Sequence, residues 1–122
     1  MSITITPTFT VEEQTLADLL ITAFEGGSNY WVSGATPLGA QTVVRPWYSD
    51  PEIWKAPALS IYLTDAETGE RYELTPEGAR KGLELLATKH PQHWADLVDE
   101  NMDAVTADVW LQLSVFGEIV FG

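Results

Sequence analysis

The segment EGGSNYW, residues 25–31, concentrates the residue types from which ligand-binding loops are built. Paired glycines let a backbone approach a ligand closely, serine and asparagine donate and accept hydrogen bonds, and aromatic rings stack on planar groups. The candidate ligand-binding residues in this segment are Glu25, Gly26, Gly27, Ser28, Asn29, Tyr30 and Trp31. The alternative, which spacing alone slightly favours, is a helix end followed by a turn whose rings enter the core. The glycine pattern is not that of a phosphate-binding loop, because neither GxGxxG nor a Lys-Ser/Thr pair is present.

A second candidate segment is VVRPWYSDPEIWKAP, residues 43–57, in which aromatic rings alternate with two of the few cations of the chain. Such a segment could stack on and neutralise an anionic ligand, or form a protein-binding patch. Arg45 and Trp47 are its candidate ligand-binding residues. The alternative is a lid that packs over one end of a sheet with its tryptophans buried.

Acid–base chemistry would have to use Glu25 or Asp108, the two carboxylates that lie within distinctive segments. A small carboxylate-dependent hydrolase is therefore one hypothesis. We favour the alternative, in which Glu25 is exposed to solvent and Asp108 lies in the first turn of a helix; Asp108 is kept as a candidate ligand-binding residue. No Ser-His-Asp pattern is visible and the chain has no cysteine, so we expect a protein that is not an enzyme.

Metal binding would depend on His90 and His93, which are three positions apart. Because Pro91 lies between them, His90 precedes the helix that carries His93, and a zinc site would need a third ligand as well. We therefore predict neither a metal nor a cofactor, and a capping or surface role for both histidines.

The net charge restricts the partners more than any motif does. Eighteen acids oppose six bases, which gives a formal charge of −12, and no base precedes Arg45. Such a field repels nucleic acid and anionic membrane. It could instead attract a basic protein surface, so a nucleic-acid-mimicking inhibitor that uses Glu12, Glu13, Asp18 and the acids of residues 94–108 is a second hypothesis. Plain solubility is the simpler explanation.

In the first part of the chain, the pattern predicts a short edge strand at residues 3–9, where isoleucines alternate with threonines. A helix follows from Thr10, which forms a capping box with Glu13. This helix would end at Gly26 as a left-handed cap. Residues 59–74 alternate in polarity around a turn that contains Asp65 and Gly69, which indicates a β-hairpin.

The second part is helical. Thr75 and Pro76 begin one helix, Pro91 a shorter one, and Asp103 or Thr106 a last one that Gly117 closes. The buried face of the last helix is predicted to hold Val105, Val109, Leu113 and Phe116. The order of elements predicts one α+β domain, residues 1–122. Its small, largely antiparallel sheet of three or four strands would pack against an N-terminal helix and two or three C-terminal helices.

Two blocks of the sequence resemble a family of small hypothetical proteins encoded by bacteriophages and prophages. They are DLLITAFEGGSNYW, residues 18–31, and MDAVTADVWLQLSVFGEIVFG, residues 102–122, in which Phe121 stands where the family has Tyr. The resemblance implies a phage or prophage origin and transfers no catalytic residue. Because both blocks occur in one family, we expect the loop after the first helix to meet the last helix in space.

The leading hypothesis is a non-catalytic binding protein, located in the cytoplasm of the host cell, that binds a small molecule or a host protein. By analogy with its source, a counter-defence role is proposed. The chain has no apolar run near the ~18 residues of a membrane span and no signal-peptide pattern. The apolar tail EIVFG is expected to pair with a second copy, which would give a homodimer.

Overall fold

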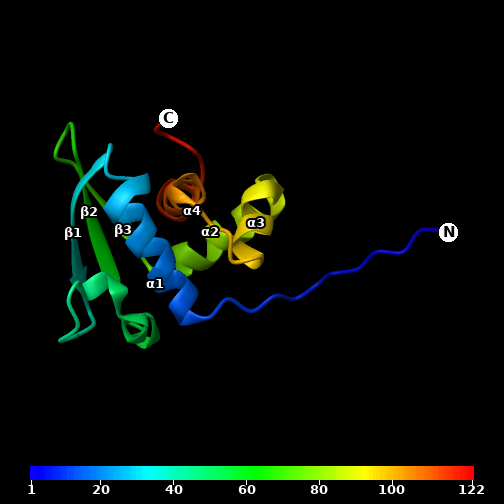
Figure 1. Ribbon diagram of the computed structural model, residues 1–122, viewed down its shortest axis with the longest axis horizontal. Helices are drawn as coiled ribbons and strands as arrows, with labels where there is room; N and C mark the ends of the chain where they lie inside the picture. The colour runs from blue at the N-terminus through cyan, green and yellow to red at the C-terminus, as the bar shows by residue number, and fades with distance from the viewer.

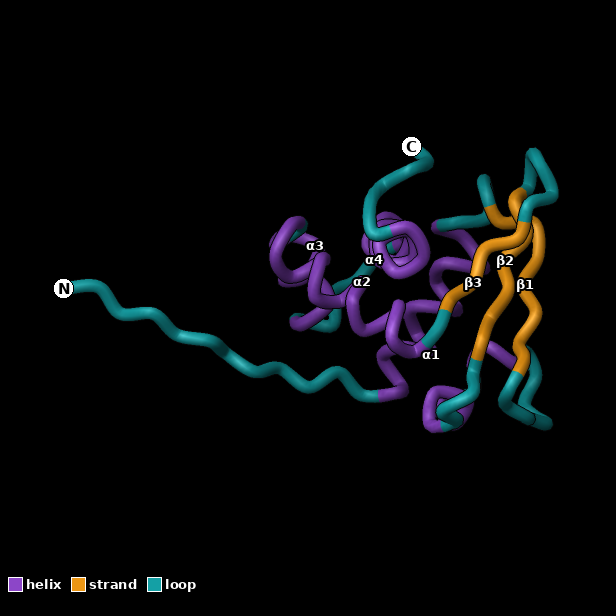
Figure 2. The backbone as a smooth tube through the Cα atoms, turned by 180° about the vertical axis from the view of Figure 1, so that it is seen from behind, coloured by secondary structure: helices purple, strands orange, loops and turns teal.

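The computed structural model describes all residues of the chain and has an α+β architecture, with a three-stranded antiparallel sheet beside four α-helices. The helices lie on one side of the sheet, and the first residues extend away from the body (Figures 1 and 2). In chain order the elements are α1 (Glu13–Thr22), a π-helical turn (Ala23–Gly27), β1 (Val32–Leu38), two 3₁₀ turns (Trp47–Ser49 and Pro51–Lys55), β2 (Ser60–Asp65), β3 (Arg71–Leu74), α2 (Pro76–Lys89), α3 (Pro91–Val98) and α4 (Ala104–Phe116).

The predicted hairpin is confirmed as β2 and β3, and β1 pairs with the other side of β2 in antiparallel register. Ile61 and Leu63 on β2 are fully buried. The residues that alternate with them, Ser60, Tyr62 and Thr64, are partly exposed, as expected for a sheet with one covered face. The side chain of Asp65 accepts hydrogen bonds from the backbone N–H groups of Glu67 and Thr68, which fixes the turn. These N–H groups hold the pKa of the Asp65 carboxyl below its usual value.

The predictions for the first residues are wrong. Residues 3–9 form no strand, because no other strand lies beside them to accept the backbone hydrogen bonds. Helix α1 begins at Glu13 with Glu12 as its N-cap residue, and no side chain caps it, so Thr10 forms no capping box. The chain is still extended and exposed at Thr10, and the local signal for a helix start loses to this exposure.

Gly26 is not the left-handed cap that the sequence suggests. The helix instead widens into the π-helical turn, in which the N–H of Ser28 donates to the carbonyl of Ala23 at 2.7 Å. The φ angle of Gly26 is not positive, so the backbone conformation at this position does not require glycine. The extra residue in the turn changes the direction in which the following side chains point.

The predicted ends of the later helices are confirmed. Thr75 accepts a hydrogen bond from the N–H of Gly78 at the start of α2, and Asp103 does the same for Thr106 at the start of α4. Gly117 closes α4 in the left-handed conformation at φ 77°. One predicted core residue is misplaced: Val105 is 59% exposed, because α4 presents the side of its first turn that carries Val105 to solvent.

The core forms where α4 packs between α2 and the sheet. Trp110 on α4 is fully buried and its indole N–H donates to the carbonyl of Ala79 on α2. The two helices approach closely at Gly82, where a Cβ atom would lie 1.9 Å from Ser114 Oγ and 2.9 Å from Ser114 Cα. None of the helices is both long enough and apolar enough to cross a membrane.

We predict that Gly82→Ala lowers the free energy of unfolding by about 1–3 kcal/mol, because the new methyl group overpacks the contact of α2 with α4. The matched control is Lys81→Ala, at an exposed neighbour on the same helix. Urea unfolding followed by circular dichroism measures both. Equal stability of the two variants would contradict the close helix contact.

Candidate functional site

The carboxylate of Asp108 on α4 forms hydrogen bonds that connect residues 18–31 with residues 102–122, the two distinctive blocks of the sequence. The residue is 9% exposed. Its Oδ1 accepts hydrogen bonds from Ser28 Oγ and Trp31 Nε1, both at 2.8 Å. Its Oδ2 accepts from the Tyr30 hydroxyl at 2.7 Å and from Gln112 Nε2 at 3.1 Å. The expectation that the loop after the first helix meets the last helix is thereby confirmed.

The position of Asp108 differs from the one expected. It lies in the second turn of α4 and is buried, whereas the sequence suggested a position in the first turn of the helix. A buried carboxylate is costly unless donors surround it, and four donors do so here. Its acceptor capacity is therefore used within the protein.

The two glycines have different roles. A Cβ atom on Gly27 would lie 2.2 Å from the carbonyl oxygen of Ala104, so Gly27 allows the backbone to touch the start of α4. A Cβ atom on Gly26 would meet nothing within 4 Å. Only the second glycine is needed to bring Ser28 and Trp31 within reach of Asp108.

Gln112, four residues after Asp108, holds the end of the chain and was not among the predicted site residues. Its Oε1 accepts hydrogen bonds from the N–H groups of Val120 and Phe121, both at 2.8 Å, and its Nε2 donates to the carbonyl of Phe121 at 3.1 Å. The signal that could have found it is the spacing of four, which places two side chains on one face of a helix.

The tail after α4 therefore folds back onto its own chain. The Phe121 ring stacks on Trp31, with centroids 4.9 Å apart and planes inclined by 11°. Phe116 and Tyr72 complete this aromatic cluster, and the Tyr72 hydroxyl donates to Asp65 at 2.8 Å. The Phe121 ring thus packs within its own chain and is not available as a contact between two copies. The homodimer expected from the tail stays a prediction.

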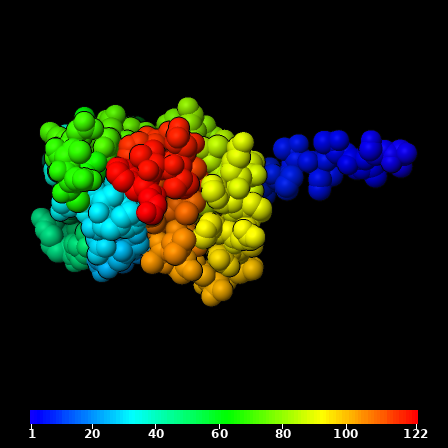
Figure 3. All heavy atoms as spheres, turned by 90° about the horizontal axis from the view of Figure 1, so that it is seen from above, coloured from blue at the N-terminus to red at the C-terminus, as the bar shows by residue number.

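A hollow of about 570 Å³ lies over this network, between the π-helical turn, α4 and the tail. We call it the α4 groove. Three of its apolar side chains are well exposed: Tyr30 at 52%, Val105 at 59% and Ile119 at 42%. The space-filling view shows the tail lying beside α4 on this side of the molecule (Figure 3). The residues that line the α4 groove are Gly26, Gly27, Tyr30, Ala104, Val105, Asp108, Val109, Gln112, Ile119, Phe121 and Gly122.

The predicted residues of the first segment separate into three groups. Ser28 and Trp31 are buried and face Asp108, so for these two the core alternative is correct. Tyr30 reaches the groove with its ring, and burial together with the Asp108 carboxylate raises its pKa to about 12. Asn29 is exposed. Glu25 is also exposed and accepts a hydrogen bond from the Tyr48 hydroxyl at 2.6 Å.

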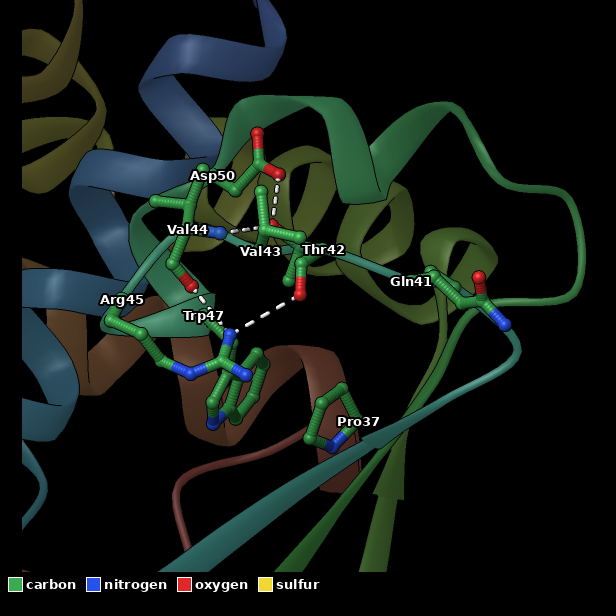
Figure 4. Close-up of a pocket in the computed structure, with 9 residues that line it drawn as sticks. Pro37, Gln41, Thr42, Val43, Val44, Arg45, Trp47 and Asp50 are labelled. Carbon is green, nitrogen blue, oxygen red and sulfur yellow. Dashed lines mark hydrogen bonds between the residues drawn. The ribbon is translucent and has the colours of Figure 1, made fainter.

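The second predicted segment lines a different hollow, of about 870 Å³, which we call the Arg45 hollow. It shares no lining residue with the α4 groove. Arg45 and Trp47 lie side by side there (Figure 4). Arg45 Nη1 donates to the backbone carbonyls of Thr42 and Val44, at 3.2 and 2.8 Å, so the guanidinium braces its own loop. Trp54, later in the segment, is buried, as the lid alternative requires, whereas Trp47 is only partly buried and lines the hollow.

The geometry contains no assembled catalytic or metal-binding constellation. Glu25 is turned toward Tyr48 while Asp108 is enclosed by its donors, so these two carboxylates do not form a pair. His93 Nδ1 lies 2.9 Å from Thr106 Oγ1, and no three His, Asp or Glu side chains are grouped to hold a metal ion.

No family model, curated protein or solved structure matches this chain.

We predict that Gly27→Ala destabilises the protein by about 1–3 kcal/mol, since its methyl group would push the turn away from α4. Gly26→Ala is the matched control and should leave stability unchanged or raise it by up to about 1 kcal/mol. Thermal unfolding of the two variants measures the difference. A reversed order would show that the first glycine sets the approach.

We predict that Asp108→Asn lowers the free energy of unfolding by about 2–4 kcal/mol, because the amide presents a donor where four donors already point. Asp18→Asn makes the same chemical change at an exposed position of α1 and should change stability by less than about 0.5 kcal/mol. Denaturant unfolding of the two variants compares them. A similar loss in both would mean that the network contributes nothing specific.

Proposed function

We propose that the protein is a non-catalytic binding domain that holds an apolar segment of a basic protein in the α4 groove. The observation that carries this proposal is the composition of the groove: exposed apolar walls over a carboxylate whose acceptor capacity is already used. Exposed apolar residues around a hollow are typical of protein-interaction surfaces. Walls that are exposed to this degree suit a polypeptide segment better than a small molecule, which pockets usually enclose.

The charge around the groove favours a basic partner. Both stretches that line it, residues 26–30 and 104–122, lack lysine and arginine. Three acids, Glu25, Asp103 and Glu118, each immediately precede a residue of the lining. A partner with lysines or arginines beside an apolar anchor would thus meet complementary charge at the rim and apolar walls inside.

The state of the carboxylates supports binding over hydrolysis. A general acid or base needs a free hydrogen-bonding position toward its substrate. Asp108 has none left, and Glu25 lies outside the groove lining and is bonded to Tyr48. We therefore propose no reaction for this site.

The resemblance to phage and prophage proteins makes a bacterial host protein the proposed partner, met in the host cytoplasm. Blocking such a protein would be a counter-defence role. The mimicry of nucleic acid is the less favoured proposal, because the acids are spread over the elements and the loops between them, and are not gathered on one. Three of them, Asp50, Asp65 and Asp108, are buried and accept hydrogen bonds from other groups of the chain.

The experiment uses Val105→Asp and a fluorescently labelled amphipathic peptide of leucine and lysine as the probe. We expect Val105→Asp to weaken binding about ten-fold in fluorescence anisotropy, since a charge replaces an apolar wall; this corresponds to about 1.4 kcal/mol. The fold should survive, because Val105 is 59% exposed and an acid is favourable in the first turn of a helix.

Val43→Asp is the matched control, because Val43 is 95% exposed and lines the Arg45 hollow instead. It changes the net charge of the protein by the same amount and should leave the affinity for the peptide unchanged. Equal effects of the two variants, or equal binding of a lysine peptide without leucine, would reduce the interaction to general charge attraction and contradict the groove.

A further inference from the structure

The first ten residues form an arm that contacts little of the chain to which it belongs. All ten are exposed, and the arm runs straight away from the body in every view (Figures 1, 2 and 3). At its root, the Phe9 ring packs edge-on against Trp94 of α3 at 5.2 Å. Beyond that point, Ile3 and Ile5 are each 77% exposed.

The sequence of the arm is that of a strand that lacks a partner. Ile3 and Ile5 alternate with threonines, so both isoleucines lie on the same face of an extended chain. Most residues of the arm are β-branched, as is typical of strands. No Asp, Glu, Lys or Arg occurs before Glu12, although the chain carries a charge of −12. The arm therefore exposes unpaired backbone groups together with apolar side chains, with no charged side chain among them.

A second hollow, of about 600 Å³, lies at the root of the arm, and we call it the root hollow. The base of the arm itself, residues 7–9, forms one wall of this hollow. The other walls are apolar side chains of α1, α2 and α3 and of the turn around Trp54: Leu16, Trp54, Ala79, Leu83, Ala87 and Trp94. The cation at its rim, Arg80, is shared by Glu77 and Glu84, and Glu13 lines the hollow as well. The rim therefore holds more acids than bases, which suits an uncharged occupant better than an acidic one.

We propose that two copies of this chain exchange arms, each arm lying in the root hollow of the other copy. Eight residues precede Phe9 and, when extended, reach about 26 Å, enough to cross to a neighbour. Because the arm leaves the body at the hollow itself, a two-fold axis near the roots brings each arm to the opposite hollow. Because the arm carries no charged side chain, its insertion adds no like charge to the acidic rim of the hollow.

The test is the mass of the full chain by light scattering, at concentrations up to about 200 µM, at which a micromolar dimer is populated. We expect twice the 13.5 kDa of one chain. Ile3→Asp with Ile5→Asp should give the mass of a single chain, because charge enters an apolar contact. Two aspartates placed instead at Val43 and Val44, in the Arg45 hollow, should leave the dimer intact.

The acceptor side is tested with Ala87→Arg, which would fill the root hollow, against Thr88→Arg on the exposed side of α2. Only Ala87→Arg should yield single chains, with unchanged circular dichroism. A mixture of Ala87→Arg with a variant that lacks residues 1–6 should form a mixed dimer, since the first contributes an arm and the second keeps an intact, open hollow. A wild-type chain that stays single, or a dimer that survives both changes, overturns the proposal.

Discussion

The buried carboxylate of Asp108 is the constraint to which the surrounding elements conform. A charge so enclosed must be compensated by donors, and Ser28 and Trp31 supply two of them from the far end of α1. The carbonyl of Trp31 in turn accepts a hydrogen bond from Ala66 in the hairpin turn at 2.8 Å. One short segment therefore ties α4 to α1 and to the sheet, and Gln112 adds the tail to the same assembly.

The same arrangement divides the surface by charge and polarity. Over Asp108 the walls are apolar, the rim is acidic, and the hydrogen bonds beneath are saturated. At the root of the arm the walls are also apolar, but a cation, Arg80, lies at the rim, where Glu77 and Glu84 share it. The two hollows therefore differ in the charges beside their apolar walls.

The sequence was informative wherever structure depends on neighbours along the chain. The turn at Asp65, the N-cap at Thr75 and the stop at Gly117 follow from local hydrogen bonds and backbone preferences, and all three were predictable. Thr10 has an equally good local signal and fails: it is exposed, and α1 begins only at Glu13, without a side-chain cap. Local chemistry selects a conformation only where tertiary contacts also support it.

In the candidate site, the loop after the first helix meets the last helix as expected, whereas the fate of each ring was not predictable. Tyr30 and Trp31 are adjacent, yet one reaches the groove and the other is enclosed. The difference comes from the π-helical turn, whose extra residue re-aims both side chains and leaves no mark in the hydrophobic pattern. The role of Gln112 was missed because it depends on a tail that is adjacent only in space.

The distance along the chain between the bonded groups has a kinetic consequence. Ser28, Tyr30 and Trp31 lie 80, 78 and 77 positions from Asp108, so most of the polypeptide must be gathered before these bonds can close. Closing so long a loop costs entropy before any contact returns it. The hairpin and α2 consist of contacts between near neighbours in the sequence, whereas burial of this single charge requires the last helix to be in place.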